Sequence, residues 1–483
     1  MAEVVVVGAG VGGLACAARL AATGHRVTVY ERSTVVGGKL GRRVVERPEG
    51  TYRFDTGPSL LTLPQVFDEL FGGVGGVTPP LVPLDPLVRH VFPDGTVLDS
   101  CADPAEFADR IAAALGPAAA ADWRGLWRRA GRVWDASWRD ILRRPVDSPT
   151  ALAGLAWRFG DLAAVAPGQS LRGLGRRRLR DPRLRMLLDR YATYTGADPR
   201  RAPAALAAVP YAELSFGGWY VPGGLGTLAD ALLERCVALG VSVHTGATVT
   251  GIATGGGGQV TGVRLGETFE PADVVVSNVD ALTLYRDLLP TPRRLARLGD
   301  RSLAGFVLLL GVAGRTPELA HHTVFFPPDY DAEFDAVFGG RPAADPAVFV
   351  TVADDPLVRP AGHEAWFVLV NAPRHGVGPG AVDWERPGLA SAYADRVLAV
   401  LAARGVDVRD RVLFREVLTP ASLEASTAAP GGAIYGTAGG LLRPANRGPV
   451  PGLFLVGGST HPGGGLPMVA LSAGIVAEQI GPA

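Results

Sequence analysis

The residues with the clearest chemistry are glycines that follow the first apolar run of the chain, residues 4–7. Gly8, Gly10 and Gly13 have the spacing G-x-G-x-x-G, and an acid, Glu31, follows at the ~20-residue interval expected of such motifs. The first glycine permits a tight turn, the second lets the backbone approach a pyrophosphate, and the third lets a helix pack closely on a strand. The carboxylate would accept hydrogen bonds from a ribose. This arrangement predicts a dinucleotide site.

The elements that must position these glycines form a strand, a helix and a second strand. Residues 4–7 are continuously apolar, as in a buried parallel strand. Residues 14–22 predict a helix that Gly24 ends, and residues 27–30 predict the second strand. The N-terminus of the helix would direct backbone N–H groups at the phosphate. Gly12 and Arg32, which lie within and beside these motifs, join the predicted cofactor-binding residues.

Two further loops extend the predicted site. The stretch "VVGGKLGRR" at 35–43 places Gly38 and a basic residue just past the ribose acid, which suits a cofactor longer than NAD and favours FAD. Lys39 or Arg42 would face a phosphate, or each would be a surface cation, and both alternatives stay open. The stretch "FDTGPSLLTLP" at 54–64 gives another tight turn, with the predicted cofactor residues Gly57, Pro58 and Ser59.

The chain closes on a loop that is almost free of side chains. Residues 453–456 predict a strand, residues 457–467 ("GGSTHPGGGLP") a glycine-rich loop, and the stretch from about Met468 a helix. Glycines at this density let the backbone approach a flat or charged group very closely. His461 is the one titratable side chain in the loop. It would either accept a proton during a reaction or brace the loop by hydrogen bonds.

Together these motifs resemble the bacterial phytoene desaturase family, within the wider amine-oxidase-like flavoproteins. Similar segments recur along the chain, at 193–206, 217–232, 272–280 and 432–446. The stretch "GVSVHTGATVTGI" at 240–252 resembles the strand whose backbone holds the adenine, which would place Val249 there. The closing loop resembles the family's G-x-x-T-H-P-G-x-G-x-P. The resemblance implies that this loop meets the flavin, with the contact residues Gly457, Gly458, Pro467 and Met468.

The resemblance also implies the fold. We expect an α/β protein with a discontinuous Rossmann-like FAD-binding domain, an inserted mixed-sheet substrate domain and a helical region that lines a tunnel or contacts a membrane. The expected FAD-binding domain comprises residues 1–72, 219–290 and 440–483; the substrate-binding domain comprises 73–96, 205–218 and 291–439; and the helical insertion comprises 97–204. The apolar run "LAGFVLLLGVAG" from Leu303 is too short to span a membrane and predicts a buried strand.

Composition excludes several classes of protein. The chain has 483 residues with a formal net charge of zero, so a general nucleic-acid role is excluded. Cys16, Cys101 and Cys236 have neither metal-site spacing nor a disulfide pattern, so we expect no metal and a reducing compartment. No apolar run reaches about 18 residues, and the N-terminus lacks the pattern of a signal peptide. We therefore expect a cytoplasmic protein, peripheral at the inner face of the cell membrane.

A stretch rich in tryptophan and arginine, residues 122–145, predicts an amphipathic helix. At about 100° per residue, Trp123, Trp127, Trp134 and Trp138 share one face, and arginines cover the other. Tryptophan opposite arginine is typical of a helix lying at a membrane surface. The same stripe would also suit a helix that faces the protein core or a tunnel, or one that binds a partner protein. The basic run at 171–185 is solvated surface or adds to a membrane-facing surface.

The resemblance implies an FAD-dependent oxidoreductase that desaturates a carotenoid or carotenoid-like polyene by hydride transfer to the flavin. Oxygen or a quinone would take the electrons. Amine oxidases usually hold flavin covalently through a late cysteine, and the last cysteine here, Cys236, falls in a predicted helix, so we expect non-covalent FAD. A flavin-dependent polyene isomerase and a non-enzymatic escort-type lipid-binding protein remain alternatives.

Two finer expectations concern the proton acceptor and the substrate. Tyr220 and Tyr435, in family-like segments, join His461 as candidates for the catalytic proton acceptor. The sequence "GLPMVALSAG", which contains Met468, resembles the branch that acts on hydroxylated or later carotenoids more than the phytoene enzymes.

Overall fold

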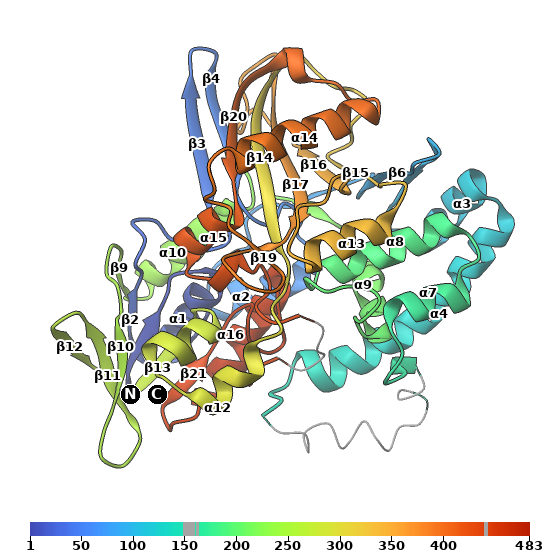
Figure 1. The fold of residues 1–483 in the computed structure, drawn as a ribbon. Coiled ribbons are helices and arrows are strands. Elements are labelled where there is room, and N and C mark those ends of the chain that lie inside the picture. Colours follow the sequence, from blue (N-terminus) through green and yellow to red (C-terminus); the bar gives the residue numbers. More distant parts are fainter. Residues whose placement is uncertain (148–159, 161–163, 439–442) are drawn as a thin grey trace.

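The computed structural model describes residues 1–147, 160, 164–438 and 443–483. Parts of the predicted helical insertion (148–159 and 161–163) and of the family-like segment 432–446 (439–442) lie outside the described residues. Figure 1 shows a sheet region that carries both chain ends, a second and taller sheet, and a helical lobe. The termini lie side by side, and the Ala483 N–H donates to the Thr23 carbonyl at 3.1 Å.

The first sheet draws its strands from the start, the middle and the end of the chain. Its five strands run in the order β21–β13–β1–β2–β9, and each neighbouring pair is parallel. The strands are β1 (Glu3–Val7), β2 (Arg26–Tyr30), β9 (Ser242–His244), β13 (Val274–Ser277) and β21 (Leu453–Leu455). The α/β fold class with a Rossmann-like sheet is thereby confirmed. The predicted domain boundaries stay a prediction.

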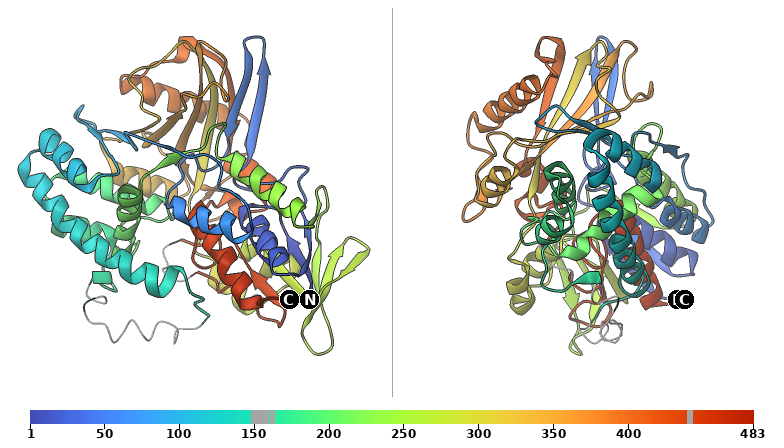
Figure 2. Two further views of the ribbon diagram at one scale, coloured as in Figure 1. Left: turned by 180° about the vertical axis from the view of Figure 1, so that it is seen from behind. Right: turned by 90° about the vertical axis from the view of Figure 1, so that its right-hand side faces the viewer.

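Small residues let helix α1 (Val11–Ala22) pack closely within this region. Ala15, Ala17 and Ala18 are fully buried, and α1 begins at Val11, three residues before the predicted start. The helices α2 (Pro64–Gly73), α10 (Gly226–Ala238) and α16 (Leu466–Ile480) share the same core. Seen from behind, they gather around α1 (Figure 2). The first and last segments of the chain thus form one packed unit.

The taller sheet has seven strands in the order β20–β14–β17–β16–β15–β6–β7. All neighbours are antiparallel except β15 and β6. The predicted strand from Leu303 is confirmed as β14, almost entirely buried. The strands are β6 (Arg89–Val91), β7 (Val97–Asp99), β14 (Ala304–Ala313), β15 (His322–Phe325), β16 (Val348–Val352), β17 (His363–Ala372) and β20 (Val412–Leu418).

Different elements pack against the two faces of this sheet. Alternate residues of β14, such as Phe306 and Leu308, pack on helix α14 (Leu389–Ala403). Val307 and Leu309 point to the other face, toward the hairpin β3 (Arg42–Arg47) and β4 (Gly50–Asp55). Figure 1 shows α14 and the hairpin on either side of the sheet. The face that carries Val307 continues into the cavity described below.

The helical lobe buries much of the tryptophan stripe. Helix α4 (Pro117–Ser137) continues into a π-helical turn, Trp138–Leu142. Trp123 and Trp134 are only 2% and 7% exposed. Of the alternatives above, the structure therefore favours a stripe that faces the protein interior, and these indoles are not available to a membrane. The other lobe helices are α3 (Pro104–Leu115), α7 (Leu171–Arg178), α8 (Pro182–Thr193) and α9 (Ala208–Phe216).

Contacts between α4 and α9 explain the glycine in the middle of α4. A Cβ on Gly131 would stand 2.9 Å from Cε2 of Tyr211 on α9, so only glycine permits this approach. The Tyr211 ring also lies 4.8 Å from that of Trp127, between ring centroids. The stripe is thus the surface on which α9 packs.

Shorter elements complete the chain. They include a three-stranded sheet, two two-stranded sheets (β5 with β8, antiparallel, and β18 with β19, parallel) and four further helices. Their bounds are β5 (Val82–Pro83), β8 (Trp219–Tyr220), β10 (Gly251–Thr254), β11 (Val260–Leu265), β12 (Thr268–Pro271), β18 (Arg374–His375), β19 (Ala381–Val382), α11 (Ala281–Thr283), α12 (Pro292–Leu295), α13 (Tyr330–Phe338) and α15 (Pro420–Thr427). Among the described residues, no helix combines the length and the apolar character needed to cross a membrane.

Candidate active site

A cavity of about 1680 Å³ lies where the two sheets and the helical lobe meet. The loops after β1 and β2 and the closing loop line one end of it, and residues of α8, α9 and the seven-stranded sheet line the rest. Pockets for single drug-sized ligands are about 300–1,000 Å³. This cavity therefore has room for a large cofactor together with a second ligand.

The predicted glycine motif forms the first wall. Gly8 has φ +98°, a left-handed conformation that favours glycine. Gly13 lies so close to the preceding strand that a Cβ would stand 2.0 Å from the Gly8 carbonyl oxygen. Gly10 is the N-cap of α1 and lines the cavity together with Gly8 and Gly12. The N–H groups at the start of α1 are thus placed to bind an anion.

Glu31 lines the cavity, but its carboxylate also holds the backbone. Oε2 accepts from the Ala9 N–H at 2.8 Å, and Oε1 accepts from the Ser33 N–H at 2.8 Å. Each carboxylate oxygen has a second lone pair, so a ribose hydroxyl still finds an acceptor here. Arg32, which donates to the Ala425 carbonyl, and Val249 line the same end of the cavity.

Lys39 is not the surface cation that the sequence left as one alternative. Its Nζ donates to the carbonyls of Ala433 and Ile434 at 2.9 and 2.6 Å, and the residue lines the cavity. Burial lowers the pKa of Lys39 to about 8, against the opposing charge of Asp280. Arg42, the other candidate, pairs with Asp230 at 2.9 Å and does not line the cavity.

The loop at 54–64 approaches this lysine segment very closely. A Cβ on Gly57 would stand 1.9 Å from the Lys39 carbonyl oxygen. Gly38, Gly57, Pro58 and Ser59 all line the cavity. The two predicted loops therefore form one continuous wall.

The closing loop completes the cofactor end, and it meets a residue that sequence reasoning did not select. Gly457, Gly458, Pro467 and Met468 line the cavity, as does Asn278 after β13. A Cβ on Gly457 would stand 2.6 Å from Oδ1 of Asn278. Asn278 thus lies between the first and last glycine loops. Its position at the end of "VVVSN", directly after a strand of the parallel sheet, is the signal that could have identified it.

Helix α16 begins where the closing loop ends. Its first residues, from Leu466 to Val469, line the cavity, and its N-cap is Gly465. No acidic residue occupies the first turn. The positive end of the helix dipole is therefore directed at the cavity and favours negative charge there.

His461 is a brace. It is 1% exposed and does not line the cavity. Its Nε2 lies 3.0 Å from the carbonyl of Ile141, within the π-helical turn, and 2.8 Å from the carbonyl of Arg144, just after it. Burial lowers its pKa. The candidate proton acceptor of the closing loop is thus directed away from the cavity, because the loop uses it to bind the helical lobe.

The two tyrosine candidates occupy different places. Tyr220 lies outside the large cavity, and its hydroxyl donates to Asp355 at 2.8 Å. Tyr435 lines the cavity, and a Cβ on Gly464 of the closing loop would stand 2.4 Å from its ring. Burial raises the pKa of Tyr435 to about 12, so the phenol stays protonated near neutral pH. It would donate a hydrogen bond and would not act as a base.

Beyond the cofactor end, the walls are largely apolar. They include Leu206, Val209, Val307, Phe349, Phe367 and Leu369. None of the three cysteines lines the cavity, and all three are buried. Burial raises the pKa of Cys236 to about 12, and its thiol donates to the Leu14 carbonyl at 3.3 Å. No thiol is therefore placed to bond to a cofactor.

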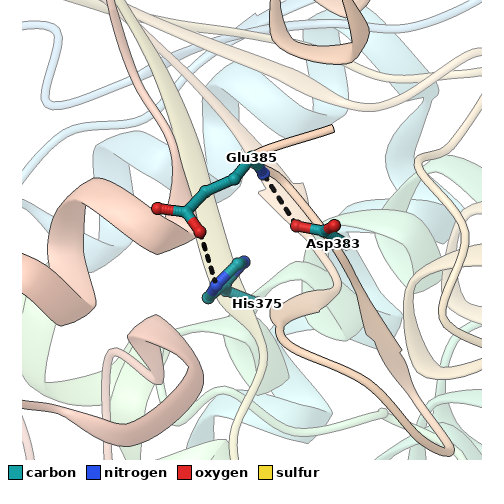
Figure 3. A group of neighbouring side chains, drawn as sticks. All are labelled: His375, Asp383 and Glu385. Atoms are coloured by element: carbon teal, nitrogen blue, oxygen red, sulfur yellow. Dashed lines mark hydrogen bonds and ion pairs between the residues drawn. The ribbon is translucent and has the colours of Figure 1, made fainter. Parts of the chain in front are cut away.

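One group of potential metal ligands lies elsewhere on the surface. His375, Asp383 and Glu385 bring their side chains together (Figure 3). The Trp384 N–H donates to Nδ1 of His375 at 3.2 Å, which places the ring proton on Nε2, opposite Glu385 at 3.9 Å. A protonated Nε2 cannot bind a metal ion. The group is better explained as a neutral histidine that contacts a carboxylate near the molecular surface.

Comparison with known proteins agrees with this architecture. Residues 11–305 match the profile of the family described as Flavin containing amine oxidoreductase. The chain belongs to the flavin-containing amine oxidoreductase family. This oxidoreductase is 33% identical to a 4,4'-diapolycopene oxygenase of Methylomonas sp, over 99% of this chain and 98% of the relative.

Two further relatives match this flavin-containing oxidoreductase from end to end. A hydroxyneurosporene desaturase of Rhodobacter capsulatus is 34% identical, over 99% of this chain and 97% of the relative. A 1-hydroxycarotenoid 3,4-desaturase of a Flavobacterium strain is 30% identical, over 99% and 98% of the two chains. The resemblance to the carotenoid desaturase family is therefore confirmed.

Solved structures show the same fold. An oxidoreductase from Methanosarcina mazei superposes with a TM-score of 0.64 at 16% identity, over 99% of this chain and 100% of the other. A cyclohexylamine oxidase from Brevibacterium oxydans gives 0.61 at 16% identity, over 99% of each chain. The family implies a flavin cofactor, and the glycine cradle, where added Cβ atoms would fill the space, fits one.

Proposed function

We propose that this oxidoreductase desaturates a carotenoid or a similar polyene, with FAD bound non-covalently. The observation that carries the proposal is the shared cavity of about 1680 Å³, in which glycine loops form one end and apolar side chains the remainder. A long hydrocarbon favours apolar walls. It has few polar groups that could form hydrogen bonds with polar side chains buried against it. The full-length relatives named as carotenoid desaturases support the same function.

The protein would hold FAD through residues of four segments. The start of α1, with Gly10 and Gly12, would bind the pyrophosphate, and Glu31 would accept from the adenosine ribose. The backbone at Val249 would meet the adenine. The closing loop, Asn278 and the start of α16 would meet the flavin ring. Without a cysteine in the cavity, the cofactor should be released on denaturation.

The bound flavin would supply the acceptor for a hydride from an allylic carbon, and the reduced cofactor would also take up the proton lost from the neighbouring carbon, so that both hydrogens leave the substrate with the cofactor. The residues around the closing loop provide placement and exclude water. Tyr435 stays protonated and His461 is directed away, so neither is positioned as a strong base. The polyene can delocalise the positive charge that hydride loss creates. Orientation of the substrate would therefore contribute more than general-base catalysis.

The substrate would come from a bilayer, because such polyenes are insoluble in water. We propose a cytoplasmic enzyme that attaches peripherally through the basic surface of α4 and α7, the exposed arginines Arg128, Arg132, Arg177 and Arg178. In this proposal the arginines contact the membrane, whereas the tryptophan stripe, which is largely buried, does not. Oxygen or a quinone would reoxidise the flavin.

Anaerobic mixing of the purified enzyme with carotenoids in micelles tests the function. Bleaching of the flavin absorbance in a single turnover, with a product that has lost a pair of hydrogens, is the expected result. Conversion of the double-bond geometry without net flavin reduction would identify an isomerase instead. Binding of polyenes by a protein that never carries flavin would identify an escort protein.

A second candidate activity is oxygenation of the polyene end. It is favoured by the full-length match to a 4,4'-diapolycopene oxygenase. Mass spectrometry of the product separates the two activities, because desaturation removes hydrogen whereas oxygenation adds oxygen. Labelled dioxygen would show the source of any oxygen gained.

A further inference from the structure

The cofactor end of the cavity contains a guanidinium whose donors are only partly used. Arg443, in the segment before β21, lines the cavity. Its Nη1 donates to the carbonyl of Tyr435 at 2.8 Å and to both the carbonyl and the hydroxyl of Thr437. Among the described residues, Nε and Nη2 have no hydrogen-bond acceptor, yet neither atom is fully buried. These unused donors can therefore be reached by a ligand in the cavity.

A second cation lies close to this guanidinium. The Nζ of Lys39 donates to the carbonyls of Ala433 and Ile434, which directly precede Tyr435 in the chain. An ammonium group has three donors, so one donor of Lys39 is left for a ligand. Burial lowers the pKa of Lys39, and the charges of Arg301 and Arg443 lower it further. The cations thus lie close enough to repel one another.

A single carboxylate opposes these charges. Asp280 pairs with Arg301 at 2.9 Å, and both side chains are almost fully buried. Burial lowers the pKa of Arg443 to about 10, and the charge of Arg301 lowers it further, against the opposing charge of Asp280. We call these four residues, Lys39, Arg301, Arg443 and Asp280, the cationic group. Three cations and one anion leave it with a net charge of 3 − 1 = +2 near neutral pH. Because buried charge is costly unless it is paired, the cationic group favours an anion in the cavity.

The cationic group adjoins the later part of the closing loop. A Cβ on Gly463 would stand 3.8 Å from Nε of Arg443. The earlier part of the loop approaches the start of α1 instead, since a Cβ on Gly12 would stand 3.1 Å from the Cα of Gly457. The expected pyrophosphate site and the cationic group therefore adjoin different parts of the loop. This placement suits the flavin ring better than the phosphates.

We propose that Arg443 and the rest of the cationic group stabilise the negative charge that hydride transfer brings to the flavin ring, an inference that rests on the proposed function. A hydride carries two electrons and one proton, so the ring gains one negative charge until the second proton follows. Cations that the fold holds in a buried site stabilise such charge without having to reorganise. The oxidised ring is neutral and gains much less. The cationic group thus favours the reduced form of the cofactor over the oxidised form.

The reduction potential of the holoenzyme tests this inference without any polyene. Arg443→Gln keeps a donor for the carbonyls of Tyr435 and Thr437 but removes the charge. Its preference for reduced over oxidised flavin should fall by on the order of 10- to 100-fold. For a two-electron couple, this change lowers the potential by about 30–60 mV. Anaerobic equilibration with redox dyes near neutral pH measures the potential.

Sulfite provides a second measurement. Its sulfur bonds to the oxidised flavin with its own electron pair, so the ring gains negative charge and the yellow absorbance bleaches. The dissociation constant for sulfite should rise in Arg443→Gln by on the order of 10- to 100-fold. Arg443→Lys, which keeps the charge, should stay near the wild-type value. Lys39→Gln should change the potential and the sulfite affinity in the same direction as Arg443→Gln, and it provides the test if Arg443→Gln does not fold.

Arg447→Met is the matched control. Arg447 lies in the same segment as Arg443, is exposed, approaches Asp147 at 3.8 Å and does not line the cavity. The control removes one positive charge from the segment without changing the cationic group. It should therefore leave the potential and the sulfite affinity unchanged. Flavin content and melting temperature report whether each variant folds.

An unchanged potential and sulfite affinity in Arg443→Gln and Lys39→Gln would overturn the inference. So would an equal loss of affinity for oxidised and reduced FAD, titrated into the apoenzyme, because the charges would then bind the phosphates. A loss in Arg443→Lys as large as that in Arg443→Gln would show that Arg443 only holds the backbone, and would overturn it too. The proposed function is judged separately, from flavin reduction by polyenes. The expected shifts in potential without such reduction would support the cationic group and contradict the desaturase function.

Discussion

The side-chain amide of Asn278 lies directly against Gly10, so that a Cβ on Gly10 would stand 2.7 Å from Nδ2. Asn278 directly follows β13, near the middle of the chain, and Gly10 comes from the first loop. The same amide contacts Gly457 of the closing loop. Three distant segments thus meet at one side chain, and glycine is required at both contacts.

This contact sharpens the prediction for the glycine motif. Gly10→Val would both occupy the space of the pyrophosphate and displace Asn278, so the purified protein should be colourless. The wild type should release all of its yellow colour on denaturation, since the proposed site holds the flavin without a covalent bond. Gly125→Ala, in an open position on α4, is the control and should retain flavin. Normal FAD content in Gly10→Val would refute the assignment of the phosphate site.

Replacement of His461 tests its role as a brace. General-base catalysis typically contributes about 100- to 10,000-fold. Since His461 contacts the carbonyls of Ile141 and Arg144 and not the cavity, His461→Gln should change the single-turnover rate of flavin reduction by less than about tenfold. His461→Ala should also lower the melting temperature, because it removes the contact with the helical lobe. A rate loss above about 100-fold at full flavin content would restore His461 as the base.

The buried tryptophan stripe predicts a stability defect. Trp134 packs against Trp138 and Phe216, with ring centroids 5.0 and 5.4 Å apart. Trp134→Ser should destabilise the protein by about 3–5 kcal/mol and lower its flavin content, whereas Trp134→Phe should cost less. Thermal melts of the three proteins give the comparison. An unchanged melt combined with loss of liposome binding would instead place this side chain at a membrane.

Membrane attachment should depend on arginines. Burial lowers the pKa of Arg129, and the charges of Arg178, Arg132 and Arg177 lower it further, which identifies one continuous basic surface. Arg177→Glu with Arg178→Glu should abolish sedimentation with anionic liposomes and leave the flavin spectrum unchanged. Wild-type binding should weaken as salt rises, because ions screen the attraction. Binding that persists in the double variant would exclude this surface.

A buried histidine predicts a pH-dependent contribution to stability. His90 is fully buried, and burial lowers its pKa from 6.5 to about 3, with the charge of Arg190 as the second cause. Between these values the unfolded chain binds a proton that the folded chain does not, so stability falls as the pH falls from 6.5. The expected slope is about 1.4 kcal/mol per pH unit.

His90→Asn isolates this contribution from other titrating groups. An amide can replace the contact of Nδ1 with the Leu98 carbonyl, at 3.0 Å, without taking up a proton. The difference in unfolding free energy between wild type and His90→Asn should therefore shift in favour of the variant as the pH falls from 6.5 to 4. A constant difference would show that His90 is protonated in the folded protein.

The sequence by itself determined the parts that depend on local patterns. The glycine spacing, the apolar runs and the acid after the second strand predicted the Rossmann-like unit, because these features act within one short segment. The closing loop was predicted as part of the same site from its glycine content and family resemblance. The buried strand β14 was likewise predicted from its continuous apolar sequence.

Only the tertiary structure decided which way ambiguous side chains point. The tryptophan stripe has the same helical spacing whether it meets lipid or protein, and the packing of α9 placed it inside. His461 lies in a loop predicted to bind the cofactor, yet the helical lobe supplies its carbonyl partners from residues some 320 positions away. Asn278 acquired its significance only through contacts across the fold. Such contacts depend on long-range packing, which no local spacing encodes.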